Sequence, residues 1–258
     1  MSPVSHNCQV ERTWVTLAER PDLFEMAIEI DRDVTAKSFM QHDEIGDLIR
    51  ARRLRDRWPE HFLVLLEGDR VRARAIAIPF SMADPDRVEL PASGWDGAVR
   101  WAIEDSLDVV EPTAACAIEI NVDPSLRGHG ISSTAIQAMK VNARNYGMSQ
   151  LVAPVRPPDK AEQPWLSMAA YASQVRDDGL PRDRWLRVHV QAGGEIVGIA
   201  PFSMVVIASI EDWREWTGLP LEADGPVEVP GGLVPVLLSH QLGFGVYAEP
   251  NVWIRHVL

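Results

Sequence analysis

The stretch that decides the fold runs from Cys116-Ala-Ile-Glu-Ile-Asn-Val-Asp-Pro124 through Ser-Leu-Arg-Gly-His-Gly-Ile-Ser132. A β-branched run typical of a strand leads into a turn with two glycines, and apolar residues then recur at helical spacing up to Gly147. The first N–H groups of a helix have no partner inside the helix, and the helix dipole places partial positive charge beside them. Glycine allows close backbone approach and Arg127 adds a fixed charge, so this segment predicts a site for a pyrophosphate.

The composition of the whole chain narrows the class of protein. Its 258 residues can bury a substantial core, and 46% apolar with 24% charged residues is ordinary for a globular protein. A formal net charge of −12 argues against a general binder of nucleic acid or anionic membranes. The two cysteines, Cys8 and Cys116, suggest no disulfide framework, and the first twelve residues lack the apolar core of a signal peptide. We therefore expect a cytoplasmic protein.

Hydrophobic periodicity and turn residues divide the chain into elements. A hairpin is expected around Gly68, the Pro-rich and charged segment 156–182 is left unassigned, and 218–258 is expected to hold two irregular strands at 233–238 and 251–257. This mixture predicts an α+β fold with a largely antiparallel sheet and flanking helices. Strands are predicted at 14–18, 61–66, 73–79, 116–122, 151–155, 195–199 and 204–209, and helices at 21–30, 42–58, 95–105, 131–147, 183–191 and 210–216.

The glycine-containing turn resembles the acyl-CoA-binding motif of the GNAT N-acetyltransferase superfamily, Gln/Arg-x-x-Gly-x-Gly/Ala. Arg127 and Gly130 occupy its first two key positions, and Gly128 matches a frequent form of the motif. Ser132 stands at the last position, where Gly or Ala is usual, and its small side chain still fits. A second resemblance, to the family's late helix-to-strand segment, covers 186–197. The likeness is clear over 110–208, fainter over 14–82 and absent over 218–258.

This resemblance implies a fold in which the fourth and fifth strands splay apart, with an irregular C-terminal extension added to it. Pantetheine would lie in the gap, held by backbone groups near Ile120 and Val122. The implied domains are a flexible tail at 1–12, an acyl-CoA N-acyltransferase domain at 13–217 and an extension at 218–258 packed on the same domain. The loop that would cradle the pyrophosphate consists of Arg127, Gly128, His129, Gly130, Ile131 and Ser132.

The resemblance also implies which residues move protons. Glu119 lies on the fourth strand just before the splay, where many family members carry a catalytic base; a salt-bridged structural carboxylate is the alternative. His189 stands four residues before Gly193, where the family often has its acid tyrosine, and Tyr171 is a rival for that role; both could instead be packed in the core. Strand alternation places 117, 119 and 121 on one face and 118, 120 and 122 on the other.

We therefore expect an enzyme that transfers an acetyl group from acetyl-CoA to a primary amine of a small molecule, by direct attack in a ternary complex. Alternatives are a longer acyl-CoA or carrier-protein donor, or a non-catalytic acyl-CoA sensor with the same fold. No Cys/His spacing suggests a metal site, and we expect no nucleic-acid or membrane partner. Two roles are open for the segment 218–258. It forms the edge of a homodimer, or it caps the cleft. Four of the nine tryptophans, at 95, 101, 165 and 185, flank the expected acceptor cleft.

Overall fold

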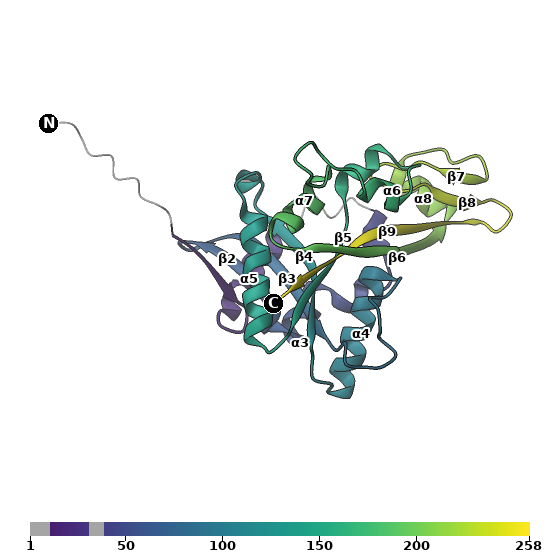
Figure 1. The fold of residues 1–258 in the computed structure, drawn as a ribbon. Coiled ribbons are helices and arrows are strands. Elements are labelled where there is room, and N and C mark those ends of the chain that lie inside the picture. The colour runs from purple at the N-terminus through teal and green to yellow at the C-terminus, as the bar shows by residue number, and fades with distance from the viewer. Residues whose placement is uncertain (1–10, 31–38) are drawn as a thin grey trace.

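The structure is a computed structural model that describes residues 11–30 and 39–258. One mixed sheet runs through this part of the chain (Figure 1). Its strands are β1 (Arg12–Thr16), β2 (Phe62–Glu67), β3 (Arg70–Phe80), β4 (Ala114–Val122), β5 (Gln150–Val155), β6 (Glu195–Ser209), β7 (Gly225–Val227), β8 (Val236–Ser239) and β9 (Phe244–Val257). They lie in the order β1-β2-β3-β4-β5-β9-β8-β7, with β6 paired to β9, and only the β4–β5 pair is parallel among the pairs described.

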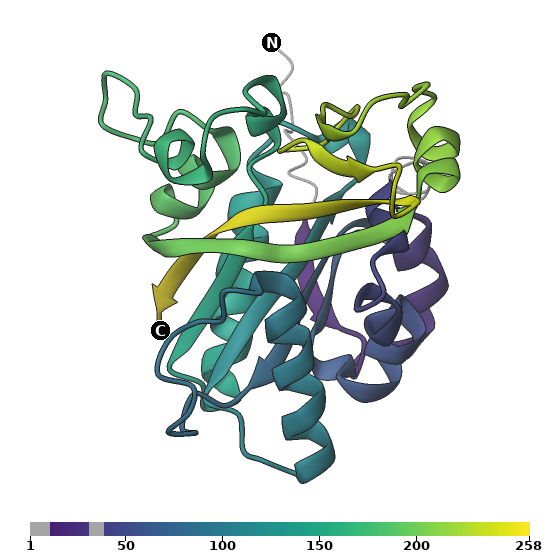
Figure 2. The same cartoon turned by 90° about the vertical axis from the view of Figure 1, so that its right-hand side faces the viewer.

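Helices cover both faces of this sheet, which is why β2 and the second half of β3, from Ala75 to Phe80, are apolar on both sides. Figure 2 shows α4 crossing one face and α5 behind the sheet on the other. Val64 and Ile76 pack in the core beneath α4, whereas Leu63 and Ala75 pack against α5. The helices are α1 (Phe24–Glu29), α3 (Ala51–Arg57), α4 (Gly94–Asp108), α5 (Ile131–Asn145), α6 (Met168–Ala172), α7 (Arg184–Gln191) and α8 (Ile210–Thr217).

The elements around the predicted site follow the sequence closely, but the helix expected at 42–58 is broken. A 3₁₀ turn, η3 (Gly46–Ile49), is separated from α3 by Arg50, whose ψ of 147° is extended. The Asp43 carboxylate accepts a hydrogen bond from the N–H of Gly46 at 2.8 Å. Such local side-chain bonds compete with the backbone bonds of a helix, and this one starts the turn instead.

The C-terminal part of the sheet differs most from the sequence expectation. The two strands predicted at 195–199 and 204–209 form one strand, β6, whose register shifts between Ala200 and Met204. The irregular strand expected at 251–257 is the second half of β9, a strand of 14 residues. β9 pairs with β6 along one edge, and β5 and β8 pair with the two ends of its other edge. Pro250 lies opposite the shift in β6, where the ladder is interrupted and a missing N–H costs nothing.

The start of α4 is fixed against this irregular part of β6. Gly94 has a φ of +45°, and a Cβ on it would lie 2.7 Å from the backbone Cα of Ser203. Only glycine permits both the left-handed backbone and this close approach. The N–H of Trp95 then donates to the Ser203 hydroxyl at 2.9 Å. The first turn of α4 is therefore attached to β6, which places Trp95 over the middle of the sheet.

Two further observations concern the ends and the surface. β1 begins at Arg12, whose Nε donates to Glu67 at 2.8 Å, and the expected tail otherwise lies outside the described residues. None of the helices in 11–30 and 39–258 has the length and hydropathy of a membrane span.

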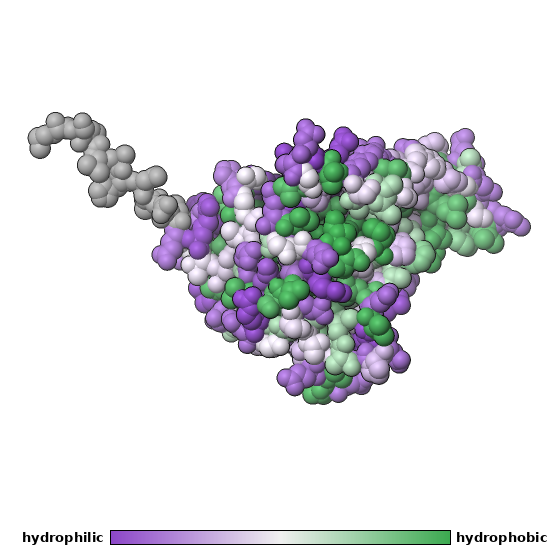
Figure 3. All heavy atoms as spheres, viewed as in Figure 1, coloured by the Kyte–Doolittle hydropathy of each residue, from purple (hydrophilic) through white to green (hydrophobic). Residues whose placement is uncertain are grey.

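Figure 3 shows hydrophobic residues at the outer end where β8 and β9 project, a region with exposed Ile207 and Leu237. The homodimer suggested by the sequence stays a prediction.

Candidate functional site

The site begins where β4 and β5 separate. The two strands are paired only from Ala114 to Cys116, opposite Gln150 to Val152. Beyond these residues β4 continues to Val122 with β3 as its partner, and β5 continues to Val155 with β9 as its partner. The facing edges of the two strands are thus unpaired with each other over their last residues. The splay of the fourth and fifth strands expected from the sequence is confirmed.

A β-bulge in β4 changes which side chains enter this gap. Ile76 pairs with Glu119 and Ala77 pairs with Ala117, so Ile118 is an extra residue on β4. The strict alternation expected for 117–122 is therefore wrong. Ala117 shares the α5 face with Ile120, and Glu119 faces the opposite side, toward α1.

The loop after β4 presents backbone donors. Gly128 and Gly130 have φ values of +80° and +75°, and a Cβ on either would meet no atom within 4 Å. Ser133 donates to the carbonyl of Gly130 at 3.1 Å, which starts α5. Within the described part of the chain, no acceptor is found for the N–H groups of Gly128, Gly130, Ile131 and Ser132. These donors, next to the positive end of the α5 dipole, fit an anion such as a pyrophosphate.

Side chains from β3 hold the start of the loop in place. The Arg72 guanidinium donates to the Asp123 carboxylate at 2.7 Å and to the Ser125 hydroxyl at 2.9 Å. Asp123 also accepts from the N–H of Ser125 at 2.9 Å, and the hydrogen bond from the Ser125 side chain is the main reason why the pKa of Asp123 is lowered. Leu126 is buried below the turn. The loop is therefore ordered by the fold before any ligand binds.

The remaining loop side chains lie at the surface. His129 is exposed, and its Nδ1 lies 3.0 Å from the carbonyl of Arg127. Ile120 and Val122 turn their side chains into the core beneath α5 and the loop, so only their backbone faces the gap. This matches a role for the β4 edge as a backbone surface rather than a side-chain pocket.

Glu119 is a positioned carboxylate at the edge of the gap. It forms an ion pair with the Nε of Arg74, and its side chain is 36% exposed. Arg74 is buried and donates from Nη1 to the carbonyls of Ala27 at 2.9 Å and Ile30 at 3.3 Å. Arg74 thus links the end of α1 to β4 and holds Glu119 in one orientation, while the carboxylate keeps access to solvent.

His189 lies in the core and not in the gap. Its Nδ1 is 3.1 Å from Nε2 of His256 on β9. Burial, and secondarily the nearby His256, lowers the pKa of His189 to about 3, so the imidazole is neutral at physiological pH. His256 pairs with Leu151, and Leu151 pairs with Ala115 on β4. Ala115 lies four residues before Glu119, which is roughly 13 Å along the strand. The structure does not bring His189 and Glu119 together.

Tyr171 is buried close to the end of β5. Its ring packs in a cluster that contains Val155 and touches Ala117 on the neighbouring strand. Its hydroxyl donates to Oδ2 of Asp183 at 3.0 Å, and Oδ1 of Asp183 caps α7 by accepting from the N–H of Leu186 at 3.0 Å. Burial, followed by the Asp183 charge, raises the pKa of Tyr171. The phenol is therefore protonated throughout the neutral range.

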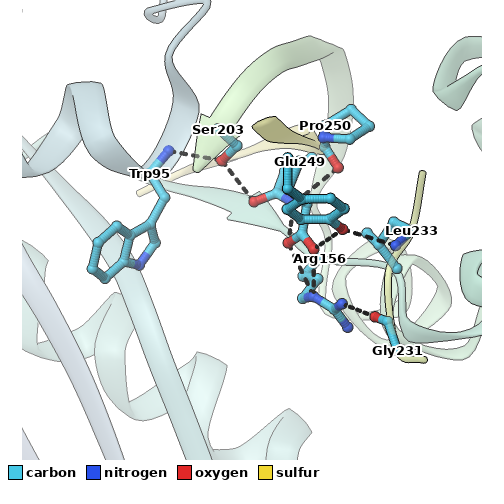
Figure 4. A network of polar contacts seen from close by, with 9 residues as sticks. Trp95, Arg156, Ser203, Gly231, Leu233, Glu249 and Pro250 are labelled. Atoms are coloured by element: carbon cyan, nitrogen blue, oxygen red, sulfur yellow. Dashed lines mark hydrogen bonds and ion pairs between the residues drawn. The ribbon is translucent and has the colours of Figure 1, made fainter. Parts of the chain in front are cut away.

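Sequence reasoning missed a buried polar network on β6 and β9, beyond the end of β5 (Figure 4). The Ser203 hydroxyl accepts from the N–H of Trp95 and donates to Oδ1 of Asn251 at 2.6 Å. The amide of Asn251 donates to Glu249 at 3.4 Å. The network thus runs from the first turn of α4 across β6 to the middle of β9.

The network ends at an arginine just after β5. Glu249 is fully buried and accepts from Nε of Arg156, with both oxygens 3.0 Å away. The Tyr247 hydroxyl donates to Glu249 at 2.7 Å and accepts from the N–H of Leu233 at 2.8 Å. Arg156 also donates to the carbonyl of Gly231 at 2.7 Å. A carboxylate within the otherwise apolar run of β9 is the sequence signal that could have revealed this network.

The sequence was compared with known proteins. No protein-family model matches the chain. The arginine N-acetyltransferase avaD of Aspergillus versicolor is 32% identical over 188 residues, which are 65% of this chain and 65% of that protein. The match thus spans just under two thirds of the length of that relative.

Solved structures provide the comparison of folds. The loading GNATL domain of CurA from Lyngbya majuscula has a TM-score of 0.54 and 14% identity, covering 96% of this chain and 98% of that one. The GphF GNAT-like decarboxylase in complex with isobutyryl-CoA has a TM-score of 0.52 and 16% identity, with the same coverage. At these identities the likeness shows the fold, and it confirms the mixed α+β architecture with a largely antiparallel sheet.

Proposed function

We propose that this chain belongs to the GNAT superfamily, which its sequence resembles, and that it transfers an acetyl group from acetyl-CoA to a primary amine of a small molecule. The observation that carries the proposal is the continuity of two features. The edge of β4 that β5 leaves unpaired leads directly into the loop, where four N–H groups have no acceptor among the residues that the structure describes. A long ligand with a pyrophosphate at one end and an extended amide-containing arm fits this arrangement.

The residues assigned to the donor are those of the loop and of the β4 edge. The pyrophosphate would lie on the N–H groups of Gly128, Gly130, Ile131 and Ser132, with Arg127 and His129 beside it. The backbone near Ile120 and Val122 would bind the pantetheine arm. Acetyl-CoA supplies an activated thioester, and the protein's part is to hold its carbonyl at the gap.

Glu119 is the proposed general base. Direct attack requires a neutral amine, and a carboxylate at the edge of the gap can accept the ammonium proton directly or through water. Arg74 is a positioning residue, because it orients Glu119 from the buried side. For the acid that protonates the departing thiolate we retain Tyr171, which keeps its proton and packs beside the end of β5. His189 is the weaker candidate, because its neutral imidazole lies in the core.

The acceptor is proposed to be a small cationic amine. The curated relative is an arginine N-acetyltransferase, and a formal net charge of −12 favours the approach of a cation. A cytoplasmic location stays a prediction from the sequence.

The test is binding followed by turnover. Isothermal titration with CoA and with acetyl-CoA is expected to give micromolar dissociation constants, and amines are then screened by thiol release. Turnover of acetyl-CoA that requires an added amine and falls in Glu119→Gln supports the proposal. Tight CoA binding without turnover on any amine, with Glu119→Gln having no effect, would support the non-catalytic sensor instead.

A further inference from the structure

Two buried carboxyl groups from distant parts of the sequence face each other beside the gap. Asp43 follows the 3₁₀ turn η2 (Phe39–His42), and Asp96 lies in the first turn of α4. They are 3% and 4% exposed, and the carboxyl of Asp96 lies within hydrogen-bonding reach of Asp43. Oδ2 of Asp43 accepts from the N–H of Gly46 at 2.8 Å. Within 11–30 and 39–258, no hydrogen-bond donor reaches the Oδ1 atom of either carboxyl group.

Most of the charge around this pair is acidic. Among the described residues, the other charged groups that act on it are Glu44 and Asp47, which are also acidic, and Arg100, which acts on Asp96 from one helical turn further along. Burial is the main cause that raises the pKa of Asp43 and raises that of Asp96 to about 8. Two carboxylates in a buried site must share a proton or a cation. A cation from a ligand could therefore take the place of the shared proton between these two carboxyl groups.

Trp95 connects the carboxyl pair with the proposed base. Its indole N–H donates to the carbonyl of Ile118 at 3.3 Å, one residue before Glu119. The far side of the indole is 3.9 Å from the position of a Cβ on Gly46, whose N–H binds Asp43. The indole thus lies between the two sites, and an aromatic face next to carboxylates favours a cation.

We propose that Asp43 and Asp96 bind a second cationic group of the acceptor, an ammonium or guanidinium group, while the reacting amine lies at Glu119. The inference rests on the proposed acyl transfer and specifies its substrate class as diamines or basic amino acids. A guanidinium group can donate to both unpartnered Oδ1 atoms at once, with the fork geometry that suits paired carboxylates. Binding exchanges the shared proton for the cation of the acceptor, so the net charge of the buried pair is the same before and after binding.

The experiment compares acceptors that differ only in the remote charge. Arginine and citrulline share the reacting α-amine and nearly the same length, and 1,4-diaminobutane and n-butylamine form a second pair. With acetyl-CoA and the full chain, the cationic member of each pair is expected to have the higher kcat/KM, by tenfold or more. In Asp96→Asn and Asp43→Asn the KM for the cationic member is expected to rise about tenfold, with little change for the neutral member.

Controls separate this inference from the proposed reaction. Asp47→Asn makes the same charge change in an exposed residue paired with Arg50 and should leave the preference intact. Direct titration of arginine into the CoA complex reports binding without turnover. Equal use of both members of a pair, or arginine affinity unchanged in Asp96→Asn, would overturn the carboxyl-pair site. The carboxyl-pair site is supported even without acylation of any amine if two results are obtained together. CoA affinity is unchanged in Asp43→Asn, Asp96→Asn and Asp47→Asn, and arginine binding is lost only in the first two.

Discussion

The two sides of the gap are built in opposite ways. The side proposed to bind acetyl-CoA, here the donor side, is a continuous segment from β4 through the loop to α5, and it offers exposed backbone N–H groups. The side proposed to bind the amine, here the acceptor side, consists of buried side chains from α4, β6, β9 and the turn at Asp43, which are far apart in the sequence. A backbone site needs only glycines and a helix start, so it can be recognised locally. A side-chain site needs the complete fold to bring its charges together.

The first prediction tests whether Glu119, which lies at the edge of the gap between the two sides, takes part in the reaction. Glu119→Gln removes the proposed base but keeps a hydrogen-bonding group next to Arg74. The kcat is expected to fall roughly 10²–10⁴-fold while the Kd for CoA changes little, because general base catalysis contributes about that much. Steady-state thiol release and titration with CoA measure the two quantities. A kcat within a few-fold of wild type would remove Glu119 from the mechanism.

The donor side is tested by a glycine pair at the two ends of α5. Gly130→Glu places a negative side chain where the phosphate is expected, and CoA affinity should fall roughly 100-fold through repulsion and a blocked site. Gly147→Glu is the matched control, because Gly147 also has a positive φ, +79°, and open space around its Cβ position. It carries the same strain and charge and should keep CoA affinity. Equal losses in both variants would contradict the loop assignment.

The buried network on the acceptor side should matter more for stability than for CoA binding. Glu249→Ala leaves Arg156, Tyr247 and Asn251 without their shared acceptor, at a cost of about 2 kcal/mol, since a buried hydrogen-bonded charge is removed. Thermal unfolding should shift down by roughly 4–8 °C in a chain of this size. Glu222→Gln, an exposed residue, is the control and should be neutral. An unchanged melting temperature in Glu249→Ala would show that the network carries no stability.

The carboxyl pair predicts an unusual pH dependence of stability. Asp96 has a pKa of about 8 in the folded chain, against an ordinary value of 3.8, so the folded chain keeps a proton that the unfolded chain releases. The free energy of unfolding should therefore fall as pH rises from about 4 to about 8 through this group. Asp96→Asn should remove that fall and be more stable than wild type at pH 8, while the two are close at pH 4. Denaturant titrations at several pH values test this, and parallel curves would contradict it.

The smallest expected effect concerns His189. Its pKa of about 3 keeps it neutral from pH 5 upward, so His189→Asn should leave the shape of the kcat/KM profile against pH unchanged between pH 5 and 9. Some stability is expected to be lost, because the hydrogen bond to His256 is removed. Disappearance of a limb of the profile in this variant would instead restore His189 as the acid and displace Tyr171.

Local signals predicted the elements around the donor site with good accuracy. The hairpin at Gly68 and the start of α7 at Asp183 both formed where their residues indicated, because each depends on residues a few positions apart. The break in the helix expected at 42–58 was also a local event, caused by the bond from Gly46 to Asp43, but its signal was weaker than the apolar spacing around it. The roles of Glu119, Tyr171 and His189 were inferred from resemblance and stay predictions.

The sequence by itself determined the proposed donor side, which consists of a strand, a loop with two left-handed glycines and the start of a helix. The free N–H groups at that helix start depend only on the local backbone, over about fifteen residues. The tertiary structure alone decided the bulge at Ile118, the insertion of β9 next to β5, and the meeting of Asp43 with Asp96. Each of these depends on pairing between segments tens of residues apart. Strand register and the burial of charge are properties of the assembled sheet, and no local pattern encodes them.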